Sequence, residues 1–142
     1  MPHKLSALRS QLLAVQQQLP ELLEVFLARD PLLPGSLYTL RRRCGKPHCH
    51  CADGELHAST VLSYRGQGRP KNVTPAPEHL EAVRRLTEDY RRFRQARTQL
   101  LRLQRQLLTL IDRLEAARVQ AGRQRFEQLP SSTSRTRTRT RR

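Results

Sequence analysis

Residues 41–57 read RRRCGKPHCHCADGELH, and this stretch holds all three cysteines of the chain and three of its five histidines. Zinc in structural sites takes four tetrahedral ligands from thiolates and imidazoles. Cys44, Cys49, Cys51 and His57 supply a complete Cys3His set, so we expect a structural Zn2+ held by these four residues. The glycines, the proline and the Asp-Gly pair of the same stretch allow the tight turns that such a loop needs.

The identity of the fourth ligand is left open by the sequence. His48 and His50 are alternatives to His57, but His50 lies between two adjacent ligands and is expected to point away from a site that both of them face. The spacing differs from that of common zinc fingers and ribbons, so it predicts a metal without predicting a known class. Three thiols without a metal are the simpler alternative, because free cysteine often behaves as a small apolar residue.

The same stretch does not favour a catalytic metal. Neither the His-x-Glu and Pro-Cys-x-x-Cys pattern of zinc deaminases nor the His-Glu-x-x-His of metalloproteases is present. Four ligands within one short loop favour a closed site, whereas a catalytic zinc needs an open position. We therefore expect that the protein is not an enzyme.

On both sides of the loop lie short segments with β-branched and aromatic residues. They predict three antiparallel strands, near residues 37–42, 57–65 and 69–74, in a module that spans residues 36–75. The cysteine loop connects the first two strands. The sequence GQG at residues 66–68 predicts the turn between the second strand and the third.

Apolar residues with steps of three and four predict a helix on each side of this module. The first lies over roughly residues 3–29 of an N-terminal segment 1–35, and Pro20 inside it predicts a kink or a break. The second runs through residues 76–128. Its seam is predicted along Val83, Leu86, Tyr90, Phe93, Arg97, Leu100, Gln104, Leu107, Ile111, Leu114, Arg118 and Ala121, with a parallel row of Ala96, Leu103, Leu110 and Ala117 beside it.

The expected fold class is mainly α with a small β element: an N-terminal helix, a zinc-stabilised three-stranded antiparallel hairpin, a long coiled-coil-like helix and a disordered Arg-rich tail at residues 129–142. The long helix would extend on the order of 70 Å and the first only about 40 Å. Part of the long seam then lies uncovered, and uncovered seams usually find a partner. We expect a homodimer through Leu100 to Ala121, and the alternative is an intramolecular helical hairpin alone.

The net charge is +15, from 27 Lys and Arg against 12 Asp and Glu, and the positive excess begins at the cysteine region. A field of this size attracts polyanions, of which nucleic acid is the commonest, although a solvated Arg-rich helix surface is the plainer alternative. The predicted phosphate-binding residues are Arg41, Arg42, Arg43, Lys46, Arg65, Arg69 and Lys71, together with Arg135, Arg137, Arg139, Arg141 and Arg142 of the tail.

Three cysteines within eight positions suit a reducing compartment better than a disulfide framework. No segment approaches the ~20 apolar residues that span a bilayer, and the first residues do not have the pattern of a secretory signal. We expect a cytoplasmic protein without a membrane partner.

Residues 36–95 resemble a family of small bacterial proteins that is classed as a domain of unknown function. The motif that carries the resemblance is R-x-x-C-G-K-P-x-C-x-C-x-x-G-x-x-H, followed by Leu-Ser-Tyr-Arg on a strand and Tyr-Arg-Arg-Phe on a helix. It falls here on Cys44, Gly45, Lys46, Pro47, Cys49, Cys51, Gly54, His57, Tyr90 and Phe93. Members are often found near transposable-element genes, so the resemblance implies an accessory role in mobile-element biology.

Two functions fit these observations. The favoured one is a zinc-stabilised nucleic-acid-binding accessory protein that contacts phosphates through the basic hairpin and the Arg-rich tail. The alternative is a coiled-coil adaptor or oligomerisation protein, whose zinc hairpin caps the helices and whose partner is a recombinase or transposase.

Overall fold

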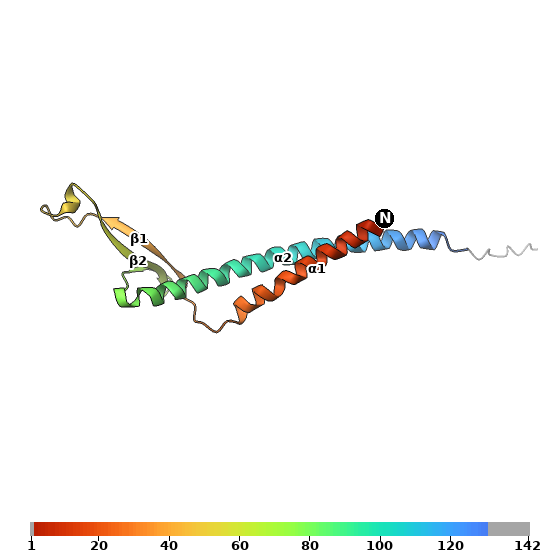
Figure 1. Ribbon diagram of the computed structural model, residues 1–142, viewed down its shortest axis with the longest axis horizontal. Coiled ribbons are helices and arrows are strands. Elements are labelled where there is room, and N and C mark those ends of the chain that lie inside the picture. Colours follow the sequence, from red (N-terminus) through yellow and green to blue (C-terminus); the bar gives the residue numbers. More distant parts are fainter. Residues whose placement is uncertain (1, 131–142) are drawn as a thin grey trace, which may run out of the picture. The chain divides into compact units, whose positions relative to one another are not determined.

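The computed structural model describes residues 2–130, and its elements follow one another as two long helices separated by a small sheet (Figure 1). The order is α1 (Pro2–Leu27), β1 (Gly35–Arg42), a 3-10 helix (His50–Ala52), β2 (His57–Gly66), β3 (Arg69–Val73), a second 3-10 helix (Pro77–His79) and α2 (Leu80–Glu127). The predicted fold class, mainly α with a small antiparallel sheet, is confirmed. The predicted tail arginines, Arg135 to Arg142, lie outside the described residues.

Helix α1 continues through Pro20 without a break. A proline inside a helix removes one backbone hydrogen bond, and it is tolerated when the flanking turns are held by packing. Here Val15, before the proline, is buried, and Leu22, after it, is half-buried. The break that was one of the two predicted outcomes at Pro20 is therefore absent.

The described residues form two compact units, which are described separately: residues 19–102, and residues 2–18 together with 103–130. In the second of these, the described elements are the first part of α1 and the last part of α2. Leu8 and Val15 on α1 and Leu103 and Leu110 on α2 are buried. Since no other described element belongs to this unit, the two helix segments cover each other's apolar side chains.

The covered side of α2 differs from the predicted seam. Arg97, Gln104 and Arg118, which the prediction placed in the seam, are exposed. The covered row keeps the same steps of three and four but contains no polar residue: Phe93, Ala96, Leu100, Leu103, Leu107, Leu110, Leu114 and Ala117. The prediction was wrong at these three polar positions and also at Ile111 and Ala121, which are exposed, because the apolar row beside them faces α1 instead.

In the unit of residues 19–102, the sheet has the order β1-β2-β3, and both pairs are antiparallel. Val61 and Leu62 are successive residues of the central strand, and both are buried, so both faces of the sheet are covered at this point. The end of α1 packs on α2 through Phe26 and Phe93, whose rings meet edge to face with centroids 5.1 Å apart. The segment between α1 and β1, residues 28–34, is held to α2 by a hydrogen bond in which the N–H of Leu33 donates to the carbonyl of Leu86 at 3.2 Å.

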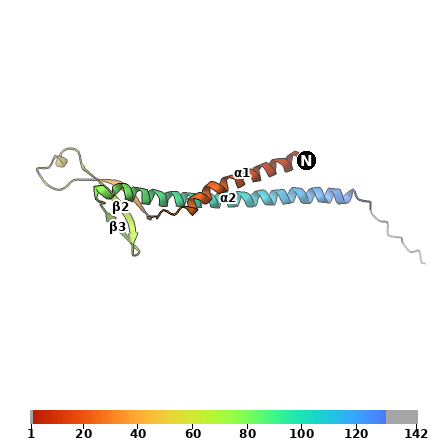
Figure 2. The same ribbon diagram turned by 60° about the horizontal axis from the view of Figure 1, so that its bottom comes forward.

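The register of the sheet fixes where the loops lie. Arg42 pairs with His57 at one end of the β1–β2 ladder, and Gly35 pairs with Tyr64 at the other. The cysteine loop therefore leaves the sheet at the first end, and the turn at residues 67–68 lies at the opposite end (Figure 2). None of the described helices combines the length and the apolar character that a membrane span requires.

Candidate metal centre

Residues 43–56 form a loop that closes the paired ends of β1 and β2. Two short turns shape it: Cys49 N–H donates to the carbonyl of Lys46 at 3.2 Å, and Ala52 N–H donates to the carbonyl of Cys49 at 3.0 Å. Apart from the 3-10 helix, the loop has no regular structure. A loop of this length inside a compact unit needs another source of stabilisation, and a bound metal is one such source.

Two glycines of the loop meet conditions that a side chain would not tolerate. Gly45 has a φ of +79°, in the left-handed region that favours glycine. Gly54 lies so close to the preceding turn that a Cβ there would be 2.9 Å from the carbonyl oxygen of His50. These positions allow the chain to turn back on itself, so that the three cysteines face the start of β2.

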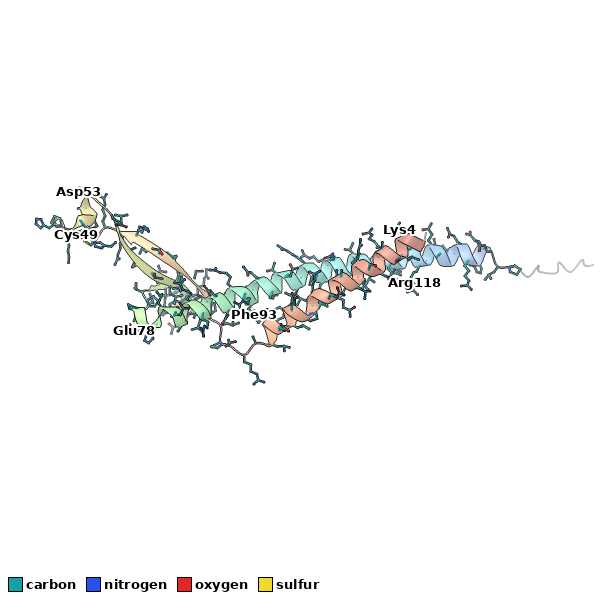
Figure 3. The ribbon with its side chains drawn as sticks, in the orientation of Figure 1. Lys4, Cys49, Asp53, Glu78, Phe93 and Arg118 are labelled. Carbon is teal, nitrogen blue, oxygen red and sulfur yellow. The ribbon has the colours of Figure 1, made fainter. Side chains whose placement is uncertain are left out.

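The donor atoms of Cys44, Cys49, Cys51 and His57, here called the cysteine group, all lie within 4.8 Å of one another. Sγ of Cys44 is 3.5 Å from Sγ of Cys51. Sγ of Cys49 is 3.1 Å from Nε2 of His57. Tetrahedral zinc with Zn–S bonds of about 2.3 Å holds two sulfurs about 3.8 Å apart, so the cysteine group is compatible with a structural metal site. Cys49 and Asp53 mark the loop in Figure 3.

The two other histidines of the loop lie outside the cysteine group. His50 approaches Cys49 with Nδ1 3.8 Å from Sγ. Its ring stands edge to face against His57, with centroids 5.0 Å apart. His48 is exposed. Of the three histidines that the sequence offered, His57 is the one whose nitrogen lies among the sulfurs.

Backbone and thiol hydrogen bonds shift the pKa values of two of the cysteines in opposite directions. The N–H of Cys44 donates to Sγ of Cys51 at 3.4 Å, and Cys51 is almost fully buried. Hydrogen bonds from the backbone of Lys46 and then from the Cys51 thiol lower the pKa of Cys44 from 9.0 to about 6. The pKa of Cys51 is raised, because burial and the neighbouring thiols outweigh the lowering effect of the Cys44 N–H. The Cys44 thiolate is therefore the form that the loop favours near neutral pH.

Three basic side chains share a hollow with the cysteine group. Arg42, Arg43 and Lys46 are exposed, and together with Cys44, Cys49 and His57 they line what we call the basic hollow. Arg42 belongs to it because it stands opposite His57 in the ladder. Arg41 pairs with Ala58 one step earlier, and alternation along the strand places it on the other face of the sheet.

The structure does not bring Arg65, Arg69 and Lys71, which were also predicted to bind phosphate, into this hollow. Arg65, Arg69 and Lys71 lie around the turn at residues 67–68, and the strand between His57 and Arg65 spans about 26 Å. Lys71 pairs with Tyr64, so Arg65 and Lys71 are also on opposite faces of the sheet. The single basic patch expected from the sequence is therefore two separate groups of residues.

Sequence reasoning passed over a further set of arginines. Between Asp89 and Asp112 the chain has six arginines and no acidic residue. Four of them, Arg91, Arg92, Arg94 and Arg102, line a groove on α2 that Leu22 and Val25 of α1 border. The uninterrupted run of positive charge in a predicted helix was the signal that could have identified them.

Comparison with known proteins gives one result. A family model described as a domain of unknown function (DUF6788) matches residues 5–85. The match takes in most of α1, the whole sheet with its cysteine loop and the first residues of α2. It agrees with the predicted resemblance to a family of unknown function. No curated protein and no solved structure matches the chain significantly.

Proposed function

The chain belongs to the DUF6788 family, since that family's model matches residues 5–85, and from this premise we propose that it is a zinc-stabilised nucleic-acid-binding accessory protein. The proposal rests on one observation above all. Arg42, Arg43 and Lys46 line the same hollow as three members of the cysteine group. A metal that holds the loop would thereby hold the three cations in one arrangement.

Zinc is the metal that this donor set suits best, because three thiolates and one imidazole are soft and borderline ligands in a tetrahedral arrangement. With three thiolates, a bound Zn2+ carries a net charge of −1. The three cations of the basic hollow exceed that charge, so the site attracts anions. Four protein ligands leave no open coordination position, and we infer a structural role rather than an enzymatic one.

Phosphodiesters are the anions that this arrangement fits. Arginine forms bidentate hydrogen bonds with phosphate oxygens, and lysine adds a point charge. Following the resemblance to proteins encoded near transposable elements, we place the proposed role in mobile-element biology. The three clustered cysteines suit a reducing compartment, so we place it in the cytoplasm. The phosphate contacts would position nucleic acid rather than read its sequence.

The experiment that tests the proposal measures binding of labelled single-stranded DNA, duplex DNA and RNA to the full-length protein at about 50 and 200 mM salt. One variant carries Arg42→Gln, Arg43→Gln and Lys46→Gln. Its matched control carries Arg9→Gln, Arg29→Gln and Arg123→Gln, which remove the same charge from exposed positions outside the predicted phosphate-binding residues. We expect the hollow variant to bind more weakly than the control, and equal binding by the two would refute the basic hollow.

A second candidate function, the adaptor that binds a recombinase or transposase, is favoured by apolar side chains that remain uncovered. Leu13, Leu23 and Leu27 on α1 and Leu108 on α2 are more than half exposed. Such side chains suit a protein interface. The homodimer predicted through Leu100 to Ala121 would have to use them, since Leu103 and Leu110 are already covered within the chain. An interface of this kind would hardly respond to salt, whereas phosphate binding weakens steeply.

A further inference from the structure

The middle of α2 carries a run of positive charge with no acidic residue of its own. Six arginines and no acidic residue lie between Asp89 and Asp112. Within residues 2–130, the stretch takes part in one ion pair, between Arg92 and Asp89, with N and O 3.7 Å apart. Arg91, Arg94 and Arg102 are exposed and make no ion pair with the described residues. Solvated helices usually alternate the sign of their charges, so this stretch departs from the ordinary pattern.

Four of these arginines, Arg91, Arg94, Arg102 and Arg105, share one side of the helix, and the first three of them lie within the unit of residues 19–102. Arg91, Arg94 and Arg102 are separated by steps of three and eight, and at 3.6 residues per turn they fall within about 80°. Thr98 lies between them on the same side, and its hydroxyl donates to the carbonyl of Arg94 at 3.1 Å. The threonine is thus satisfied by its own helix and places no acidic or bulky group between the guanidinium groups.

A groove runs beside these arginines within the unit of residues 19–102. Arg91, Arg92, Arg94 and Arg102 line it, and Leu22 and Val25 of α1 form its apolar border. We call it the arginine groove. Phe93, labelled in Figure 3, lies between two of these arginines in the sequence and packs on Phe26, which ties this part of α2 to α1. The guanidinium groups are therefore presented by a packed pair of helices.

We infer that the arginine groove binds the phosphate backbone of a nucleic acid, as a second contact separate from the basic hollow. This inference rests on the proposed nucleic-acid-binding function. From Arg91 to Arg102 the helix rises about 17 Å. A DNA strand in a duplex presents one phosphate per about 3.4 Å of its axis, so the groove spans about five phosphates of one strand.

Nucleic acid fits the arginine groove better than a membrane surface does. Interfacial helices place large apolar or aromatic side chains beside their cations, pointing into the lipid. Here the apolar side chains that line the groove, Leu22 and Val25 of α1, are half-buried, and Leu101, which is 42% exposed, is not part of the lining. Guanidinium groups with a recessed apolar border suit phosphates flanked by sugars.

The test uses full-length protein with Arg91→Gln, Arg94→Gln and Arg102→Gln. The matched control carries Arg97→Gln, Arg118→Gln and Arg125→Gln, which remove the same charge from exposed positions on other sides of α2. Circular dichroism and zinc content of both variants confirm that they fold. Binding to labelled DNA and RNA is then measured by fluorescence anisotropy over a range of salt concentrations.

We expect the groove variant to bind about tenfold more weakly or worse at low salt. The slope of log K against log salt should fall by about 2 to 3, because each lost phosphate contact removes about 0.9. The control should keep a slope close to that of the wild type. Equal losses in the two variants would overturn the inference, since they would show a response to total charge alone.

The basic-hollow variant, measured in the same series, separates failure of this inference from failure of the proposed function. If the hollow variant loses binding and the groove variant does not, the arginine groove is wrong and the proposed function stands. If neither variant differs from its control, both are wrong. The groove variant is also tested on vesicles of equal parts phosphatidylglycerol and phosphatidylcholine. If it loses binding to these vesicles while its nucleic-acid binding is unchanged, the arginine groove is not a nucleic-acid site.

Discussion

Arg42 of β1 lies directly opposite His57 of β2, as the last pair of the β1–β2 ladder. This pair joins a cation of the basic hollow to a member of the cysteine group. Residues fifteen apart in the sequence are thereby fixed side by side by the sheet, and the loop between them carries the three cysteines. The position of the charge and the geometry of the candidate metal centre thus depend on each other.

Substitution of the cysteine group is expected to abolish metal binding. Wild-type protein should purify with about one equivalent of zinc, and Cys51→Ser and His57→Ala with far less, because a structural site needs all four ligands. His50→Ala is the control, since His50 lies beside the cysteine group but outside it. The measurement is inductively coupled plasma mass spectrometry of purified protein. If His57→Ala keeps zinc and either His48→Ala or His50→Ala loses it, the fourth ligand is that histidine and not His57.

Cysteine reactivity in the metal-free protein should depend on pH in a defined way. The pKa of Cys44 is lowered to about 6 and that of Cys51 is raised, so iodoacetamide should label Cys44 first. A thiol whose folded pKa is lowered stabilises the folded loop above its ordinary pKa of 9.0, and this contribution is lost as the pH falls through about 6. Peptide mapping after labelling at pH 6, 7 and 8 should show the preference for Cys44 growing as the pH falls. A ratio of Cys44 to Cys51 labelling that does not change with pH would contradict the difference between their pKa values.

Gly54→Ala is expected to weaken metal binding without touching a ligand. A Cβ at Gly54 would lie 2.9 Å from the carbonyl oxygen of His50, so the turn beside Cys51 must shift. Gly122→Ala is the control, because a Cβ there meets nothing within 4 Å in a helix, and it should stabilise α2 by about 0.5–1 kcal/mol. Competition with a chelator compares the zinc affinities of the two variants. Equal affinities would show that the close approach at Gly54 does not shape the site.

The elements of the fold could be predicted because their signals are local. Steps of three and four in the apolar residues mark both helices, and β-branched segments with a turn at residues 66–68 mark the strands. The donor set followed from chemistry, since three cysteines and a following histidine satisfy a tetrahedral metal. These inferences do not require knowledge of which elements pack against each other.

It was harder to predict which side of each helix is covered and which basic residues of the sheet lie close together. Helix α2 carries two neighbouring rows with the same spacing, and spacing alone does not say which row α1 covers. The apolar row with Leu103 and Leu110 is covered, whereas Arg97 and Gln104 of the other row are exposed. The distance between Arg42 and Arg65 could have been inferred from the predicted strands, because an antiparallel pair places its two connections at opposite ends.

Two leucines of α2 test the observed packing. Leu103 is 3% exposed and Leu108 is 61% exposed. Leu103→Ala should reduce the free energy of unfolding by about 2–5 kcal/mol, because it leaves a cavity, and Leu108→Ala by less than about 1 kcal/mol. Urea denaturation followed by circular dichroism gives both values. Equal losses would contradict the intramolecular packing alone and favour a second copy that covers Leu108, which light scattering would then show as a dimer.

The most direct test of the central claim, that a metal-held loop presents cations to nucleic acid, is the salt dependence of nucleic-acid binding before and after zinc is removed. When zinc is removed from the wild type, the slope of log K against log salt should fall by about 0.9 for each phosphate contact in the basic hollow. The variant with Arg42→Gln, Arg43→Gln and Lys46→Gln should start at that lower slope and change no further. The same slope in the wild type with and without zinc would contradict the account.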